Sequence, residues 1–285
     1  MGNKSLGVRL TSRFRSNKIL ASLMASTGVS LINHRWIFIV GCYNSGTTLL
    51  EQVLSTHSRI SGINEEGVML TDRLRRPEDF GWRRMWVRCE NEMTMPEDSA
   101  LAAAQRIKKQ WSHFYDKSKP FLVEKSISNT PRMIFFEEHF SPAYFIHIVR
   151  NGYAVSEGIR RKAHIMVGNP YYEKKRYPIS ACAEQWKRSL QIVEECRPKV
   201  KNLLEITYED LTERTDIVLK TICEFLQLPP FDSGLRKKEV MVHGQRHSIQ
   251  NMNPESIGRL SERDIANIEE IGGDYLRKYN YYPSV

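Results

Sequence analysis

A short segment rich in glycine and hydroxyl groups, GCYNSGTT at residues 41–48, follows the apolar run Trp36–Val40 and precedes a stretch with helical periodicity. At such a strand-to-helix turn the backbone N–H groups converge on one point, and the helix dipole favours an anion there. Gly46 permits close approach of the backbone to a ligand, and Thr47 and Thr48 add hydroxyl donors. The segment therefore predicts an anion-binding loop.

Gly41 and Gly46 have the G-x-x-x-x-G spacing of the nucleotide-binding P-loop, and Thr48 stands at the position of its Ser or Thr. The lysine that reaches the β- and γ-phosphates in that loop is replaced by Thr47. P-loop enzymes also hold magnesium with an Asp at a neighbouring strand end, whereas the third predicted strand here ends in Arg150. Because a guanidinium donates bidentately to phosphate, these residues indicate a phosphorylated nucleotide handled without a metal.

Apolar segments alternate with helical patterns along the chain and determine where these residues lie. The predicted strands cover residues 36–40, 120–126, 143–150 and 202–211. Uninterrupted apolar strands between helices are typical of a parallel sheet covered on both faces, so we expect the α/β class. Ligands of such sheets bind at the carboxyl ends of the strands, where the residues that follow each strand should meet.

The bulk composition narrows the function. The chain has 285 residues, is 41% hydrophobic, and carries 42 Lys and Arg against 33 Asp and Glu, a formal charge of +9 that favours an anionic partner. Its five cysteines are odd in number and lack C-x-x-C spacing, which favours a reducing compartment, and we expect a cytoplasmic protein. The N-terminal segment is too short and polar for a membrane span. We expect an N-terminal arm at 1–34 and one domain at 35–285.

Five motifs, in order, resemble those of sulfotransferases that use 3′-phosphoadenosine 5′-phosphosulfate (PAPS). GCYNSGTTLL resembles their 5′-phosphosulfate loop, and IHIVRNGYAVSEGI resembles their 3′-phosphate motif. VEKSISNTPRM is similar to a segment of the bacterial and tyrosylprotein-type members, and ITYEDLTERTDIVLKTICEFLQL to a later strand and helix. RHSIQNMNPESIGRLSE resembles the C-terminal loop that closes over the nucleotide. The resemblance runs from about Trp36 to Asn280 and implies a single-domain, P-loop NTPase-like sulfotransferase fold.

The resemblance also implies a set of nucleotide-binding residues. PAPS is the expected donor, PAP the product, and no metal is expected. The residues implied for the nucleotide are Tyr43, Asn44, Ser45, Gly46, Thr47, Thr48, Arg150, Ser156, Tyr208, Arg246 and Ser248.

Two positions depart from the family pattern. Many members carry Lys or Arg where this chain has Asn44, and many have Ser where it has Gly158, eight residues after Arg150. Ser156, or the basic residues Arg160 and Arg161, could supply the contact that Gly158 lacks.

The resemblance implies a catalytic glutamate and a cation for the leaving group. Glu65 matches the catalytic glutamate of the tyrosylprotein sulfotransferases when the chain is aligned from the loop without gaps, and Glu66 matches it if the turn shifts by one residue. Lys125 is the predicted cation for the leaving group. The expected function is transfer of a sulfuryl group from PAPS to an acceptor hydroxyl of a glycan, a tyrosine or a small alcohol. A P-loop kinase and a basic nucleic-acid-binding protein are the alternatives, and neither nucleic acid nor a membrane is an expected partner. The oligomeric state is left open.

Overall fold

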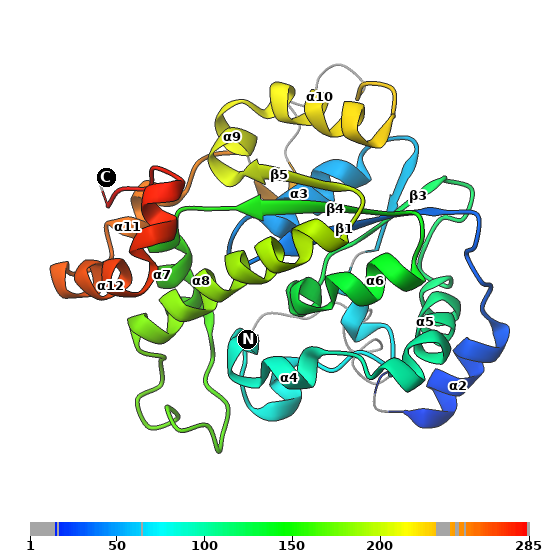
Figure 1. Ribbon diagram of the computed structural model, residues 1–285, viewed down its shortest axis with the longest axis horizontal. Helices are drawn as coiled ribbons and strands as arrows, with labels where there is room; N and C mark the ends of the chain where they lie inside the picture. The colour runs from blue at the N-terminus through cyan, green and yellow to red at the C-terminus, as the bar shows by residue number, and fades with distance from the viewer. Residues whose placement is uncertain are drawn as a thin grey trace.

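A five-stranded parallel sheet with strand order β2-β3-β1-β4-β5 forms the centre of the protein (Figure 1). The computed structural model describes residues 15, 17–63, 65–231, 240–242, 245–247 and 249–283. The strands are β1 (Arg35–Gly41), β2 (Ile60–Gly62), β3 (Phe121–Glu124), β4 (Ala143–Val149) and β5 (Leu203–Thr207). A separate antiparallel pair joins β6 (Val240–Val242) to β7 (Gln245–His247).

The central strand β1 explains why both faces of the sheet are covered. Trp36 and Phe38 point into one hydrophobic cluster, while Ile37 and Ile39 point into the other, and all four are almost fully buried. Burying such side chains stabilises the fold by roughly 1.5–3 kcal/mol each. The α/β prediction is therefore confirmed.

Helices pack on both faces of the sheet. The second cluster is closed by α3 (Thr47–Ser55) and α10 (Thr215–Leu226). The first is closed by α5 (Glu97–Trp111), α6 (Met133–His139), α7 (Gly152–Lys162), α8 (Ile179–Cys196) and α12 (Glu262–Lys278). The arrows of β4 and β5 in Figure 1 point toward the end of the sheet where α7, α9 (Tyr208–Glu213) and α11 (Asn253–Ile257) lie.

The strand predictions differ from the structure at two main points. The predicted strand 202–211 is too long, because β5 ends at Thr207 and Tyr208 begins α9. The Thr207 hydroxyl accepts a hydrogen bond from the Asp210 N–H at 3.0 Å, which caps this helix and ends the strand. The three-residue strand β2 was missed, since so short a segment carries no periodic signal.

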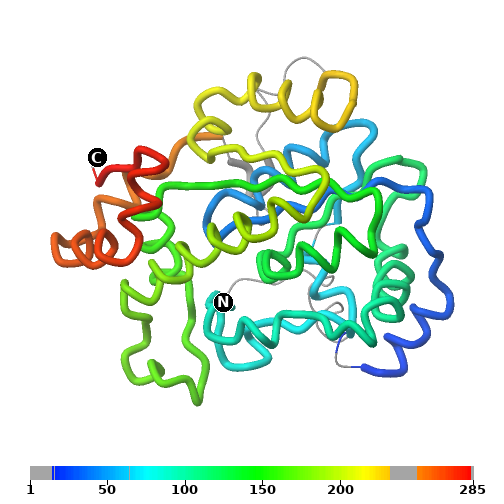
Figure 2. The backbone as a smooth tube through the Cα atoms, in the orientation of Figure 1, coloured from blue at the N-terminus to red at the C-terminus, as the bar shows by residue number. Residues whose placement is uncertain are grey.

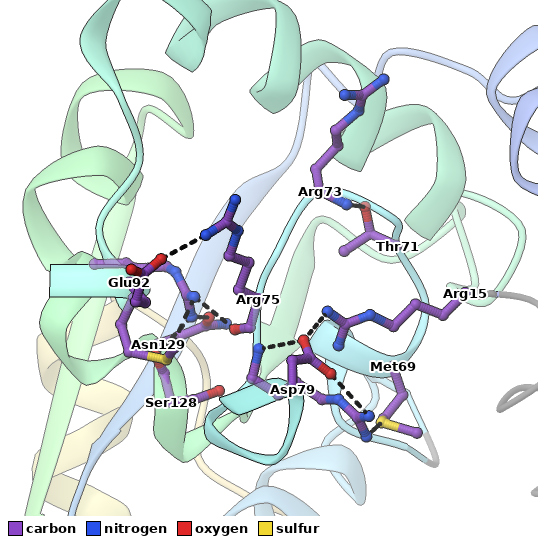
Figure 3. A network of polar contacts seen from close by, with 12 residues as sticks. Arg15, Met69, Thr71, Arg73, Arg75, Asp79, Glu92, Ser128 and Asn129 are labelled. Carbon is purple, nitrogen blue, oxygen red and sulfur yellow. Dashed lines mark hydrogen bonds and ion pairs between the residues drawn. The ribbon is translucent and has the colours of Figure 1, made fainter. Parts of the chain in front are cut away.

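A segment without long helices, here called the connector (residues 65–89), links β2 to α4 (Glu90–Met93). It contains 3₁₀ turns at Gly67–Met69, Pro77–Phe80 and Trp86–Cys89. Figure 3 shows part of the polar network that fixes it, in which Asp79 accepts from Arg15 and Arg75 pairs with Glu92. Buried Arg132 donates to the Arg75 carbonyl at 2.6 Å.

Two further segments complete the fold. In the N-terminal part, α2 (Lys18–Thr27) packs on α5, where the Gln110 amide donates to the Ala21 carbonyl at 2.9 Å. Residues 163–178, here called the long loop, project between α7 and α8 (Figure 2). None of the helices in the described ranges combines the length and apolarity needed to cross a bilayer.

Candidate active site

A cleft of about 520 Å³ lies at the carboxyl end of the sheet, where the loops after β1, β3 and β4 meet. The glycine-rich loop forms its floor. Gly46 has a left-handed φ of +93° and is the N-cap of α3, with no side chain capping the helix. The first N–H groups of α3 are thus available to a ligand. A Cβ at Gly46 would lie 2.5 Å from the Tyr208 ring, so only glycine fits here.

Arg150 joins the end of β4 to this loop. Its Nη1 donates to the Asn44 carbonyl and its Nε to the Asn253 Oδ1, both at 2.7 Å. Its guanidinium carbon lies 4.1 Å from the centroid of the Tyr208 ring. Nη2 is buried and has no hydrogen-bond partner among the described residues. Burial lowers the pKa of Arg150, as expected for a poorly solvated cation that can bind an anion.

Other donors at the loop are also unsatisfied. The Ser45 hydroxyl and the Asn44 Nδ2 are buried and lack partners within the described part of the chain. Buried polar atoms normally have hydrogen-bond partners. Three unpaired donors beside an uncapped helix N-terminus therefore fit an anionic ligand such as a nucleotide phosphosulfate.

Tyr208 connects the loop to the C-terminal part of the chain. Its hydroxyl donates to the Gln250 carbonyl at 3.0 Å and accepts from the Met252 N–H at 3.2 Å. Tyr208, Gln250 and Met252 all line the cleft. Asn253, which follows directly, orients Arg150 through the hydrogen bond to Nε.

A lysine that follows the end of β3 lies on the cleft between two carboxylates. Lys125 Nζ is 3.1 Å from Glu66 Oε1 and 4.0 Å from Glu51 Oε2. Burial alone would lower the pKa of Lys125, but the Glu66 and Glu51 carboxylates outweigh it and raise that pKa. Lys125 is therefore a charged group that holds Glu66 at the cleft.

The backbone next to Glu66 is rigidly held. The Gly67 N–H donates to Glu124 Oε1 at 3.0 Å, and the Gly67 carbonyl accepts from Trp111 Nε1 at 2.9 Å. A Cβ at Gly67 would lie 2.7 Å from both Glu124 and Trp111. Glu124 is buried and also accepts from Ser126 and Asn129. It braces the turn that carries Glu66.

Glu51 makes the stability of the protein depend on pH. Burial raises its pKa to about 8, against the opposing effect of Lys125. Its contribution to stability is fully present below the unfolded-state pKa of about 4.5 and is lost as the pH rises through about 8, because the unfolded state ionises first. Glu51→Gln should match the wild type near pH 4.5 and exceed it at pH 8 by about 2–5 kcal/mol. Urea unfolding between pH 4.5 and 9 measures this difference, and a difference that does not vary with pH would contradict it.

Residues 36–233 match the family model described as the sulfotransferase family. That range is more than half of the 285-residue chain. The chain belongs to the sulfotransferase family. Its predicted class of enzyme is confirmed, and the kinase and nucleic-acid-binding alternatives are set aside.

Relatives and a solved structure agree with this family. Protein-tyrosine sulfotransferase A of Caenorhabditis elegans is 23% identical over 271 residues, or 87% of this chain. Protein-tyrosine sulfotransferase 1 of Danio rerio is 25% identical over 244 residues, or 80% of this chain. The chain spans 68% and 65% of the lengths of these relatives. A sulfotransferase structure from Mycobacterium avium superposes with a TM-score of 0.57 at 10% identity, covering 98% of this chain and 87% of its own, which confirms the fold.

The cleft of this sulfotransferase brings together most of the residues expected from the sequence. Those that line it are Tyr43, Asn44, Gly46, Thr47, Thr48, Lys125, Arg150 and Tyr208. Ser45 lies buried within the loop. Their individual roles stay predictions.

Four expected residues stand apart. Ser156 is fully buried within α7 and is not among the cleft-lining residues that the structure describes, but its hydroxyl has no hydrogen-bond partner among the described residues, so its phosphate contact stays a prediction. Glu65 is likewise outside that described lining, whereas Glu66 belongs to it. Ser248 lies outside the described residues. Arg246 belongs to β7, but its side chain is outside the described part.

The basic candidates after Arg150 are engaged elsewhere. Arg160 forms a bidentate pair with Asp264 at 2.7 and 3.1 Å, and Arg161 donates to Glu157 at 2.9 Å. The next residue, Lys162, lines the cleft instead.

One wall of the cleft is formed by the connector and was not predicted from the sequence. Glu78, Arg83 and Arg84 line the cleft from this segment. The connector lacks any long periodic element, so no pattern could assign its side chains to the site. The one related signal in the sequence was the neutral Asn44 at a position where many family members carry a cation.

Proposed function

We propose that this sulfotransferase transfers a sulfuryl group from PAPS to an acceptor hydroxyl without a metal ion. The observation that carries the proposal is the set of unsatisfied donors at the loop, Arg150 Nη2, Ser45 Oγ and Asn44 Nδ2, beside the uncapped start of α3. When bound, PAPS supplies a sulfuryl group already joined to a phosphate that can leave. The loop and Arg150 are suited to hold such phosphate groups through N–H, hydroxyl and guanidinium donors.

The chain's other residues have separate tasks in this reaction. Glu66 accepts the proton of the acceptor hydroxyl as that oxygen attacks sulfur. Lys125 orients Glu66 and adds positive charge near the transferring group. Tyr208 supports Arg150 through ring contact and closes the nucleotide side of the cleft.

The proposed acceptor class rests on the names of the two relatives. The two relatives are named for protein tyrosine, so a peptide tyrosine is the first acceptor to test, with a glycan and a small alcohol beside it. The setting we propose is cytoplasmic, in keeping with five cysteines that are all free thiols. A screen with radiolabelled PAPS over the three acceptor classes identifies the acceptor. Activity that persists in EDTA is the expected result for metal-free transfer.

Binding of PAP tests the donor site directly. By isothermal calorimetry the wild type should bind PAP, and Arg150→Ala should weaken binding about 10- to 100-fold, since hydrogen bonds to a charged group contribute about 1.5–3 kcal/mol. Arg160→Ala is the matched control, because its guanidinium pairs with Asp264. Wild-type protein that does not bind PAP would refute the proposed function.

A further inference from the structure

The loop position where many family members carry a cation is neutral in this chain, yet a cation reaches it from elsewhere. Asn44 Oδ1 accepts a hydrogen bond from Arg84 Nη1 at 3.3 Å, across 40 residues of sequence. Both residues line the cleft. The acceptor is a neutral amide oxygen, so this contact does not cancel the charge of the guanidinium.

The surroundings hold Arg84 at this position. Its guanidinium carbon lies 5.9 Å from the centroid of the Tyr43 ring, in the same loop, within range of a cation–π contact. The residues that follow Arg84, Met85 and Trp86, are fully buried and anchor this part of the connector. Arg84 itself has a left-handed φ of +60°, a conformation that non-glycine residues rarely adopt.

The long loop holds the same part of the connector from the other side. Tyr177 donates its hydroxyl to the Arg83 carbonyl at 3.2 Å, and Asn169 donates to the Gly81 carbonyl at 2.8 Å. The Tyr177 ring also stacks on Trp82 with centroids 6.2 Å apart. Arg84 is thus fixed by contacts of its neighbours.

The other side of Asn44 is closed by α7. A Cβ at Gly158 would lie 3.0 Å from Asn44 Cγ, closer than nearly all real contacts. The two departures from the family pattern, at positions 44 and 158, are therefore in contact with each other. Glycine at 158 leaves the room in which the Asn44 side chain meets Arg84.

We propose that Arg84 supplies the positive charge that position 44 lacks and contacts the 5′-phosphosulfate end of the donor. This inference rests on the proposed function. In the transfer step, the acceptor oxygen forms a bond to sulfur and gives its proton to Glu66. The bond from sulfur to the bridging oxygen breaks, and its electron pair stays on that oxygen in the departing 5′-phosphate of PAP. Arg84 stabilises the charge that collects there.

Lys125 cannot replace Arg84 in this role without giving up its present partners. Its ammonium group is already paired at 3.1 Å with Glu66, the base that it orients. Arg84 is the cation in direct contact with the loop side chain that occupies the family's basic position.

A comparison of two nucleotides tests whether Arg84 contacts the 5′ end of the donor or its 3′ end. Calorimetry on wild type, Arg84→Ala and Arg84→Gln would use PAP, which carries both phosphates, and adenosine 3′-phosphate, which lacks the 5′-phosphate. Both variants should bind PAP about tenfold or more weakly, because charge-assisted hydrogen bonds are strong. Their affinity for adenosine 3′-phosphate should stay within twofold of wild type. Equal losses for both nucleotides, or none for PAP, would overturn the inference, whereas wild type that binds neither would refute the donor site itself.

Moving the positive charge from position 84 to position 44 provides the second test. Arg84→Gln should reduce kcat about 100-fold or more, by comparison with loss of a single donor to a developing oxyanion. Adding Asn44→Arg to Arg84→Gln should restore at least tenfold of both kcat and PAP affinity. Arg88→Ala, in the same connector but paired with Glu184, is the matched control and should behave as wild type. Failure of Asn44→Arg to restore PAP affinity in a folded double variant would show that Arg84 does not act at the loop position.

Discussion

Glu66→Gln should lower the rate of sulfuryl transfer roughly 10²- to 10⁴-fold, the usual contribution of a positioned general base. Glu66 lines the cleft, its Oε1 lies 3.1 Å from Lys125 Nζ, and its backbone neighbour Gly67 is fixed by Glu124 and Trp111. Glutamine keeps the size and one oxygen but cannot take a proton from the acceptor. Single-turnover kinetics with saturating PAPS measures the chemical step directly.

Glu65→Gln is the matched comparison for this variant. Both substitutions remove one negative charge from adjacent positions, so a difference between them reports position and not net charge. We expect Glu65→Gln to retain most of the transfer rate and both variants to bind PAP as wild type does. If Glu65→Gln is inactive and Glu66→Gln is active, the gap-free alignment is right and our assignment of Glu66 fails.

Lys125→Met should cause the other large effect, on both rate and stability. Removing the cation deprives the transferring group of positive charge, for which we expect a loss of roughly 10²- to 10³-fold in kcat. It also leaves buried Glu51 beside Glu66 without their shared partner. Above pH 8, where Glu51 ionises, the variant leaves a buried carboxylate without its cation, and breaking a buried ion pair on one side destabilises a protein by about 3–5 kcal/mol. Urea unfolding and steady-state kinetics measure the two effects separately.

The double variant Lys125→Met with Glu51→Gln separates catalysis from folding. Glutamine at position 51 removes the carboxyl that would otherwise be left buried, so most of the lost stability should return. The transfer rate should not return, because the charge at the cleft is still absent. Recovery of rate together with stability would show that Lys125 only supports the structure.

The fold was predictable because its signals are long and regular. β1, β4 and the helices that follow them have continuous apolar runs and 3.6-residue periodicity, and the motif after each strand fell at the carboxyl end of the sheet. Because those elements were predicted, the positions of the loop residues Gly46 and Thr48 and of the strand-end Arg150 could be predicted with them. Tyr208 was expected at the carboxyl end of the sheet, where it lies. It was expected as part of a strand, however, and it begins helix α9.

The rest of the site depends on irregular backbone. The choice between Glu65 and Glu66 turns on one residue in the path that leaves β2, which no periodicity specifies. Arg84 lies in the connector, where 3₁₀ turns and a positive φ set the direction of the side chain. Such geometry depends on tertiary contacts, among them those of Arg132 with the Arg75 carbonyl and of Arg15 with Asp79, and not only on local sequence preferences.

The hydrogen bonds from the long loop to the connector have a consequence for chimeric enzymes. Asn169 and Tyr177 donate to the backbone carbonyls of Gly81 and Arg83, so the two segments form one structural unit although 88 and 94 residues of sequence separate the bonded pairs. Exchanging only one of them with a relative would leave these carbonyls without their donors and would move Arg84. A graft from a relative should therefore transplant residues 77–89 and 163–178 together.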